Sequence, residues 1–343
     1  MTTERLAADG AGIARAAALL REGALVAIPT ETVYGLAADA LNGGAVAGIF
    51  AAKGRPMDNP LIVHIAALED WAPLVTAIPE KARRLAEACW PGPLTIILPH
   101  APCVPGEVTA GLPTVAVRMP SHPVARQVIR AAGRPLAAPS ANRSGIPSPT
   151  SAAHVLRDMD GRIAAVLDGG ECSVGVESTV VDLSGETPRL LRPGGVTLET
   201  LEAAAGTVLV DEAVTHALRE GAVAASPGMK YKHYAPQAHV VLVKGSPEAY
   251  TAFVNARAAE VSEGLAALCF TGEEAGLTVP AVSYGGRKDA AAQARHVFDA
   301  LRRLDDIGAQ LVYAACPSPE GMGLAVYNRL LRAAGFEVIS LDG

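Results

Sequence analysis

The run AGIARAAALLREGALVAI, residues 11–28, decides the fold class of this chain. Its first part, 11–22, has the small and apolar residues of a helix, and Gly23 supplies a common helix stop. Residues 24–28 are a short apolar run of the kind that forms a buried strand. A helix that leads directly into a buried strand is typical of α/β proteins. We therefore predict an α/β fold.

The same alternation of helix and strand continues along the chain. Further helices are predicted at 44–53, 79–89 and 122–132, with Pro79 as a first helical residue, and strands at 61–65, 94–98, 114–118, 135–138, 163–167 and 178–183. After residue 238, strands are predicted at 239–244, 265–270 and 310–316, and helices at 248–261, 289–304 and 324–334. In a chain of 343 residues, this pattern predicts two domains, 1–205 and 239–343, joined by a linker at 206–238.

Charge, cysteine content and apolar runs exclude several classes of protein. The net charge of −6 argues against broad, sequence-independent nucleic-acid binding, which needs an excess of lysine and arginine. No two of the five cysteines form a CxxC pair, so a structural zinc site and a disulfide framework are not expected. The first ten residues lack the apolar core of a signal peptide, and no apolar run approaches the length of a membrane span. We expect a cytoplasmic protein without a membrane partner.

Six polar clusters carry the side chains suited to chemistry, and the predicted strands place them at or just beyond strand ends, where open α/β sheets bind ligands. They are PTETVYGL at 29–36, KGRP at 53–56 with Asn59, Pro60 and His64, WPGPLT at 90–95, TVAVRMP at 114–120, APSANRSG at 138–145 with Ser148, and EST at 177–179 with LRPGG at 191–195. Lys53 and Arg55 are close enough in sequence to face one anion, while Arg118 and Arg192 add guanidinium groups that suit carboxylate or phosphate.

A nucleoside triphosphate fits this set of cations and hydrogen-bond donors. Ser140, Asn142 and Ser148 can donate to phosphate oxygens. Neither GxxxxGK[ST] nor a clean GxGxxG occurs, so the common nucleotide-binding folds are not supported. Each residue alone also has an ordinary structural interpretation: His64 could be a core histidine, and Tyr231 and Tyr234 could be surface rings. The separate residues decide nothing.

Taken together, the motifs resemble one family. PTETVYGL, KGRP with NPL and VHI, WPGPLT, VAVRMP, PSANRSG, ESTVVDL and LRPGG follow the order and approximate spacing of the threonylcarbamoyl-AMP synthase (YrdC-like) family. KYKHYAP and the α/β run after it resemble the long, two-domain form of that family. The resemblance implies a twisted mixed sheet with helices and a large concave cavity, followed by a smaller, Rossmann-like α/β domain.

The resemblance also implies a reaction, in which L-threonine, bicarbonate and ATP give threonylcarbamoyl-AMP and pyrophosphate. A separate transferase then passes the threonylcarbamoyl group to the adenosine that follows the anticodon in tRNA. The residues implied to hold threonine are Thr32, His64, Arg118 and Ser178. Those implied to contact ATP are Lys53, Arg55, Asn59, Thr114, Ser140, Asn142, Ser148, Arg192 and Tyr231. The family often has threonine where this chain has Ala138, so no contact is assigned there.

Catalysis of this kind needs no protein nucleophile, because positioning and charge stabilisation are sufficient. No cluster of aspartate and glutamate suits a metal ion, so Mg²⁺ is expected to be carried by the ATP phosphates and water. Two other functions stay open at this point: a nucleic-acid-binding module, and a carbamoyl-adenylate-forming maturation domain of the kind found inside larger chains with zinc-finger cysteines. A weak direct contact with tRNA is also left open.

The linker has an unusual composition. Ordinary linkers are rich in glycine and serine, whereas residues 230–234 read KYKHY and lie between Pro227 and Pro236. Rings and cations suit a nucleotide and its phosphates, so we predict a lid that excludes water from a readily hydrolysed mixed anhydride. The alternative is a structural strap packed against the domains.

Overall fold

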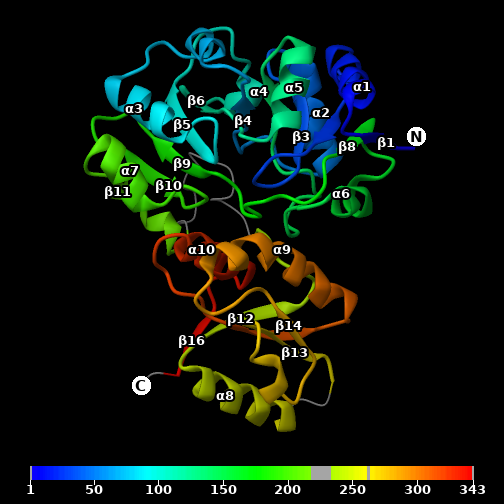
Figure 1. Ribbon diagram of the computed structural model, residues 1–343, viewed down its shortest axis with the longest axis vertical. Helices are drawn as coiled ribbons and strands as arrows, with labels where there is room; N and C mark the ends of the chain where they lie inside the picture. The colour runs from blue at the N-terminus through cyan, green and yellow to red at the C-terminus, as the bar shows by residue number, and fades with distance from the viewer. Residues whose placement is uncertain (1, 218–232, 261–262, 342–343) are drawn as a thin grey trace. The chain divides into compact units, whose positions relative to one another are not determined.

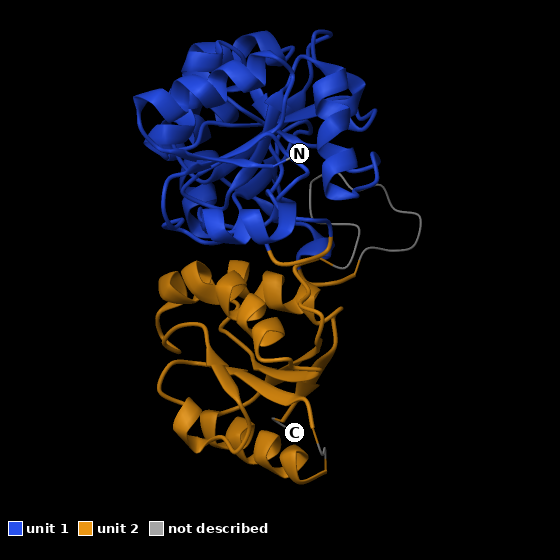
Figure 2. Cartoon of the chain, turned by 90° about the vertical axis from the view of Figure 1, so that its right-hand side faces the viewer, with its two compact units in different colours: residues 1–144, 148–214, 218–230 blue, residues 145–147, 215–217, 231–343 orange. Residues whose placement is uncertain are grey.

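The structure is a computed structural model, and it describes residues 2–217, 233–260 and 263–341. The described residues form two compact units (Figure 2). Unit 1 comprises 2–144 and 148–214, and unit 2 comprises 145–147, 215–217, 233–260 and 263–341. The boundaries assigned to the domains and linker stay a prediction, and residues 218–232 of the predicted linker lie outside the described residues.

Unit 1 is built on a sheet of eleven strands (Figure 1). In spatial order they are β1 Glu4–Ala7, β8 Ala165–Asp168, β2 Val26–Ile28, β3 Gly35–Asp39, β7 Leu136–Ala137, β4 Ile62–His64, β6 Thr114–Arg118, β5 Leu94–Pro99, β9 Thr179–Asp182, β10 Arg189–Arg192 and β11 Leu209–Val210. Strand β6 pairs in parallel with β4 and antiparallel with β5. The predicted mixed α/β sheet is therefore confirmed, whereas the concave cavity stays a prediction.

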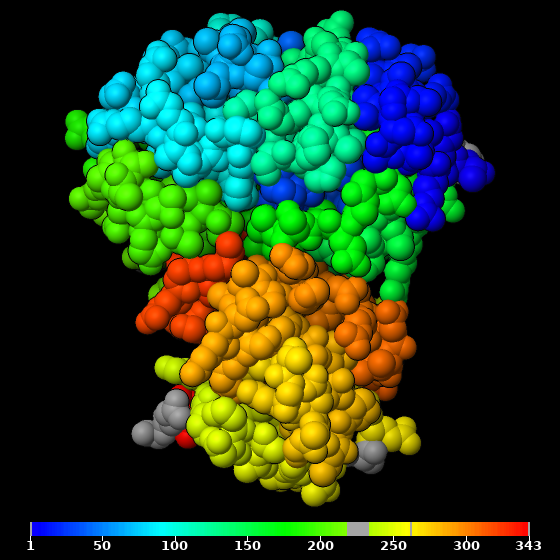
Figure 3. All heavy atoms as spheres, viewed as in Figure 1, coloured from blue at the N-terminus to red at the C-terminus, as the bar shows by residue number. Residues whose placement is uncertain are grey.

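Apolar side chains are buried on both faces of this sheet. Along β2, Val26 and Ile28 pack into one core cluster and Ala27 into another, because successive side chains of a strand point to opposite faces. The helices that cover the sheet are α1 Gly10–Arg21, α2 Gly43–Lys53, α3 Glu80–Cys89, α4 Gly106–Thr109, α5 Pro123–Ala132, α6 Ala152–Met159 and α7 Leu198–Ala205. Helix α1 packs against α5, and α3 packs against α7. Figure 3 shows side chains filling the space between the ribbons on this side of unit 1.

Local signals explain where the helices of unit 1 begin and end. The Asp9 side chain accepts a hydrogen bond from the backbone amide of Gly12 and so caps α1. Helix α2 ends at Gly54, which has the left-handed backbone conformation that glycine adopts without strain. One detail of the prediction is wrong: Pro79 is the residue before α3, and Glu80 begins the helix.

Unit 2 is a separate α/β unit with five parallel strands. Their spatial order is β14 Ala281–Ser283, β13 Leu265–Cys269, β15 Leu311–Ala315, β12 His239–Lys244 and β16 Val338–Ser340. Helix α8, Pro247–Glu260, lies on one face, and α9, Ala290–Asp306, lies beside α10, Gly323–Ala333, on the other (Figure 1). This agrees with the smaller α/β domain expected from the sequence.

Among the described residues of both units, no helix has the length and apolarity that a membrane crossing requires.

Candidate functional site

Polar side chains line up across neighbouring strands of unit 1. The pairing of β4 with β6 places His64 opposite Arg118, and the pairing of β5 with β6 places Thr95 opposite the same arginine. Directly paired residues point to the same face of a sheet. All three side chains are buried. The sheet register therefore brings together residues from three separate sequence motifs.

Arg118 is the centre of this row. Its Nη1 donates to Thr32 Oγ1 at 2.9 Å, its Nε donates to the Gly92 carbonyl at 3.3 Å, and its Nη2 lies 2.7 Å from Glu31 Oε1. Burial by itself would raise the pKa of Glu31, but the charge and the hydrogen bond of Arg118 hold it below its usual range. The pair is therefore ionised inside the protein.

Glu31 was not among the predicted site residues, although it stands in the quoted PTETVYGL motif. A signal for it was present, because a buried arginine requires an acidic or polar partner. Which acidic residue forms the ion pair with Arg118 depends on how β6 and the segment after β2 are placed in the fold. The sequence of the motif does not determine that placement.

His64 is neutral at physiological pH. Burial and the neighbouring positive charge of Arg118 lower its pKa to about 3. Its Nδ1 lies 3.2 Å from the Ile62 carbonyl, so in the neutral ring this nitrogen carries the proton. The unprotonated Nε2 of His64 can therefore accept a hydrogen bond from a ligand, but the ring carries no positive charge.

We expect the His64→Gln variant to resist mild acid better than the wild type. Between pH 6.5 and 3, an unfolded histidine binds a proton that the folded His64 does not, so wild-type stability falls as the pH falls. From pH 7 to 4.5, the loss in unfolding free energy should be about 2–3 kcal/mol smaller in the variant. Urea unfolding followed by the fluorescence of Trp71 and Trp90, both in unit 1, measures this. Parallel pH curves for the two proteins would contradict the neutral assignment.

Ser178 extends the row to β9 and β10. The hydroxyls of Thr95 and Ser178 share a hydrogen bond of 2.8 Å. Arg192 at the end of β10 donates from Nε to the Ser178 carbonyl at 3.0 Å and from Nη2 to its hydroxyl at 3.1 Å. Arg192, predicted to contact ATP, thus holds a residue predicted to contact threonine. Thr95 stands in the WPGPLT motif but was not among the predicted site residues.

The LRPGG segment lies directly on the backbone of the EST motif. A Cβ atom at Gly194 would come within 2.3–2.4 Å of backbone atoms of Thr179, Glu177 and Ser178. No side chain fits in that space, so the position requires glycine. The close approach is what brings Arg192 within reach of Ser178.

Gly194→Ala is therefore expected to lower the stability of unit 1 by about 1–3 kcal/mol, because the added methyl group meets rigid backbone. Gly185→Ala is the matched control, since a Cβ there meets nothing within 4 Å. The control should change the unfolding free energy by no more than about 0.5 kcal/mol. Tryptophan fluorescence in denaturant distinguishes the two variants, and equal stabilities would contradict the close approach.

Ser148 joins the same network through a second acid. Its hydroxyl donates to Glu177 Oε1 at 2.5 Å, and both residues are buried. Because Glu177 precedes Ser178, the predicted ATP and threonine residues are adjacent here. Glu177 stands in the EST motif and, like Glu31 and Thr95, was not among the predicted site residues.

Lys53 organises the PSAN segment. Its Nζ donates to the backbone carbonyl of Ser140, to that of Asn142 at 2.6 Å, and to Asn142 Oδ1 at 3.4 Å. Ser144 N donates in turn to the Lys53 carbonyl at 3.0 Å. Burial, followed by the nearby charge of Arg55, lowers the pKa of Lys53 well below its usual range. These contacts make Lys53 a positioning residue for the loop that carries Ser140 and Asn142.

Three further predicted residues lie near the amino-terminal ends of β4 and β6. Arg55 Nη2 donates to the carbonyls of Asn59 and Pro60 at 3.4 Å each. Thr114 begins β6, on the same face as Arg118 but about 13 Å before it along the strand. The KGRP motif follows α2 rather than a strand, so the expectation that every cluster lies at a strand end is wrong for this one.

The predicted lid falls largely outside the described part of the chain. Residues 230–232, including Tyr231, are not described. Tyr234 is described, and it is no surface ring: it is buried within unit 2, with its ring centroid 5.2 Å from that of Phe298 and 5.5 Å from the Arg329 guanidinium. The lid therefore stays a prediction.

Comparison with known proteins gives two matching family models. The model described as "Telomere recombination" matches residues 18–194, and the one described as "Threonylcarbamoyl-AMP synthase, C-terminal domain" matches residues 196–335. The chain is 47% identical to the threonylcarbamoyl-AMP synthase of Bacillus subtilis, across 98% of this chain and 97% of that protein. A protein of the same name from Schizosaccharomyces pombe is 40% identical, across 90% of this chain and 84% of that protein.

A solved structure agrees over the whole chain. The crystal structure of Sua5 from Pyrococcus abyssi complexed with L-threonine is 43% identical, with a TM-score of 0.93, and the match covers 99% of this chain and 100% of that one. The two family models match one after the other along the chain. The chain belongs to the threonylcarbamoyl-AMP synthase family, in its two-domain form.

Proposed function

We propose that this protein is a nucleotidyltransferase that makes threonylcarbamoyl-AMP and pyrophosphate from L-threonine, bicarbonate and ATP. The observation that carries the proposal is the convergence on Arg118: it bonds Thr32, lies opposite His64, and reaches Ser178 through Thr95. These are the residues expected to hold threonine. The names of the B. subtilis and S. pombe relatives and the threonine complex of the P. abyssi protein support the same function.

The proposed site residues fall into two groups. Threonine is held by Thr32, His64, Arg118 and Ser178, and ATP by Lys53, Arg55, Asn59, Thr114, Ser140, Asn142, Ser148, Arg192 and Tyr231. The guanidinium of Arg118 pairs with the amino-acid carboxylate, and Nε2 of neutral His64 accepts a hydrogen bond from a donor group of the threonine. Arg192 touches Ser178 and so stands where the two groups meet.

The chemistry requires positioning more than covalent help from the protein. The threonine amine attacks the bicarbonate carbon and, with loss of water, forms a carbamate. A carbamate oxygen then attacks the α-phosphorus of ATP, and the bond to pyrophosphate breaks. Arg192 and Arg55 stabilise the negative charge that develops on the phosphates. Holding the carbamate in line with the α-phosphorus supplies much of the rate enhancement.

Magnesium enters this proposal as part of the nucleotide. In the described ranges, no group of three or more histidine, cysteine, aspartate or glutamate side chains is placed to hold a metal ion. The two buried acids of the site are engaged, Glu31 by Arg118 and Glu177 by Ser148. We propose that Mg²⁺ is bound by phosphate oxygens and by water, which this ion commonly retains.

The product is a reactive mixed anhydride, so a second enzyme must use it promptly. We place this reaction in the cytoplasm, upstream of a separate transferase that carries the threonylcarbamoyl group to tRNA. A weak contact of this protein with tRNA belongs to the same proposal. The five cysteines are all unpaired, in keeping with a reducing compartment.

The test is to incubate the pure protein with ATP, L-threonine and isotope-labelled bicarbonate, and to measure pyrophosphate and the labelled adenylate by mass spectrometry. Both products should appear together, and omission of threonine or bicarbonate should abolish both. L-serine is a matched substrate control, because it lacks only the methyl group that a buried site can recognise. Equal ATP turnover without threonine would overturn the proposal.

A further inference from the structure

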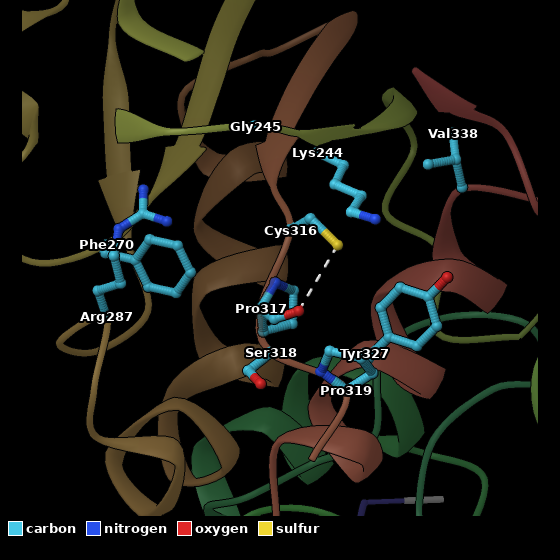
Figure 4. A pocket seen from close by; sticks show the side chains of 10 residues that line it. All are labelled: Lys244, Gly245, Phe270, Arg287, Cys316, Pro317, Ser318, Pro319, Tyr327 and Val338. Atoms are coloured by element: carbon cyan, nitrogen blue, oxygen red, sulfur yellow. Dashed lines mark hydrogen bonds between the residues drawn. The ribbon is translucent and has the colours of Figure 1, made fainter. Parts of the chain in front are cut away.

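Unit 2 contains a cavity of about 370 Å³ that the proposed reaction does not use (Figure 4). Ligand pockets in proteins commonly measure roughly 300–1,000 Å³, so the volume suits a small molecule. The lining residues are Lys244, Gly245, Phe270, Arg287, Cys316, Pro317, Ser318, Pro319, Tyr327 and Val338. All of them belong to unit 2, and none is among the residues proposed for threonine or ATP.

The cavity lies where parallel α/β sheets bind ligands. Lys244 ends β12, Phe270 follows β13, and Cys316 follows β15, so the carboxyl ends of three strands meet at it. Strands β12 and β15 are neighbours, but the chain leaves β12 through α8 on one face and β15 through α10 on the other. Such a divergence opens a crevice between the two strand ends.

The charge of the cavity favours an anion. Lys244 is exposed, and within the described chain no hydrogen bond or ion pair engages its ammonium group. Arg287 is committed elsewhere, since it forms hydrogen bonds of 2.8 and 3.1 Å with Glu273 and lies 4.4 Å from the centroid of the Phe270 ring. None of the lining residues is acidic. Lys244 is therefore the cation available to a ligand.

The other residues that line the cavity suit a ligand with an apolar body and a polar end. Figure 4 shows the rings of Phe270 and Tyr327 on opposite sides of the space, with Cys316 and Pro317 between them. Burial raises the pKa of Tyr327, so its hydroxyl keeps its proton and can donate a hydrogen bond. Ser318 also lines the cavity, with its hydroxyl on the side away from Lys244 (Figure 4).

We propose that this cavity binds a small organic anion whose carboxylate or phosphate pairs with Lys244 and whose flat or apolar body lies between Phe270 and Tyr327. The Tyr327 hydroxyl, which lies on the same side of the space as the Lys244 ammonium (Figure 4), completes the contacts of the acidic group. The site is a feature of the C-terminal unit and does not depend on the proposed synthase activity.

Alkylation of Cys316 reports occupancy of the cavity in the full-length protein. Burial raises the pKa of this thiol to about 11, with an opposing effect of Lys244, so labelling is slow but measurable at alkaline pH. Peptide mapping separates Cys316 from the exposed Cys103, which serves as the internal standard. Benzoate and phenyl phosphate are the probes, and benzamide is the uncharged match for benzoate.

Benzoate or phenyl phosphate should slow labelling of Cys316 but not of Cys103, by about threefold at twice the dissociation constant, and benzamide should not. Lys244→Met should weaken the affinity for the anion at least about tenfold, so that protection at the same concentration falls to about 1.2-fold or less, whereas Lys288→Met, at an exposed lysine that does not line the cavity, should keep the threefold protection. Protection is the ratio of the Cys316 labelling rates without and with the probe, measured within each variant. This is necessary because loss of Lys244 also changes the labelling rate of the Cys316 thiol itself. No protection by either anion at millimolar concentration, equal protection by benzamide, or protection that survives Lys244→Met would overturn the proposal.

Discussion

Arg118→Met is expected to abolish pyrophosphate release and to lower the unfolding free energy of unit 1 by about 3–5 kcal/mol. The stability loss arises because Glu31, buried and held ionised by Arg118, is left without a partner. The activity loss arises because the same guanidinium positions Thr32 and is the cation proposed for the threonine carboxylate. Methionine preserves much of the volume of the side chain, so the change tests charge rather than packing.

The double variant Glu31→Gln with Arg118→Met separates these two effects. Neutral glutamine removes the stranded charge, so most of the stability should return while activity stays absent. Because Trp71 and Trp90 are the only tryptophans and both lie in unit 1, their fluorescence in denaturant reports this unit without a contribution from unit 2. Calorimetry on the whole chain would mix the two units. If the single and double variants were equally unstable, the buried ion pair would not be the cause.

Arg118→Lys tests recognition rather than charge. Lysine keeps a cation near Glu31 but lacks the planar pair of donors that matches a carboxylate. The concentration of threonine needed for half-maximal rate should rise much more than that of ATP. Equal shifts for the two substrates would contradict the assignment of Arg118 to threonine.

The second large effect is expected for Arg192→Ala, which should raise the requirement for both ATP and threonine. A charge-assisted hydrogen bond contributes about 1.5–3 kcal/mol, which corresponds to a change of roughly 10- to 150-fold. Both substrates are affected because Arg192 is proposed to contact ATP and also donates to the carbonyl and hydroxyl of Ser178. Arg55→Ala should raise the requirement for ATP alone. Arg55 is proposed to contact ATP, and it donates to the carbonyls of Asn59, another residue proposed for ATP, and Pro60 rather than to a residue proposed for threonine.

Titration calorimetry with ATP, and initial rates with threonine varied at constant ATP, measure the two requirements separately. Arg189→Ala is the matched control: it removes an exposed arginine from the same strand, β10, and should leave both unchanged. Unchanged ATP affinity in both Arg55→Ala and Arg192→Ala would show that the triphosphate is not held by these cations. If Arg192→Ala left the threonine requirement unchanged, the hydrogen bonds from Arg192 to Ser178 would not be needed for threonine binding.

Much of the fold was predictable because its signals are local. Helix α2, Gly43–Lys53, and strands β6, Thr114–Arg118, and β12, His239–Lys244, agree with their predicted bounds to within one residue. Their glycine stops and apolar runs act through neighbouring residues of the same segment. Strand β3, Gly35–Asp39, was not predicted, because GLAAD has little strand preference and is held by pairing with β2 and β7.

By itself, the sequence determined the two α/β regions, the end of helix α2 at Gly54, and the residue types proposed for the site, among them Arg118, Arg192 and Lys53. Only the tertiary structure decided which groups those cations meet: Glu31 and Thr32 for Arg118, Ser178 for Arg192, and the backbone of the PSAN segment for Lys53. The two side-chain partners of Arg118, Thr32 and Glu31, lie 86 and 87 residues away along the chain. Local preference cannot specify contacts over such separations, because they depend on strand register and on close approaches such as that of Gly194 to the EST backbone. Glu31 is present in the PTETVYGL motif, but the motif does not show that it pairs with Arg118. The pairing is required only because folding buries both charges.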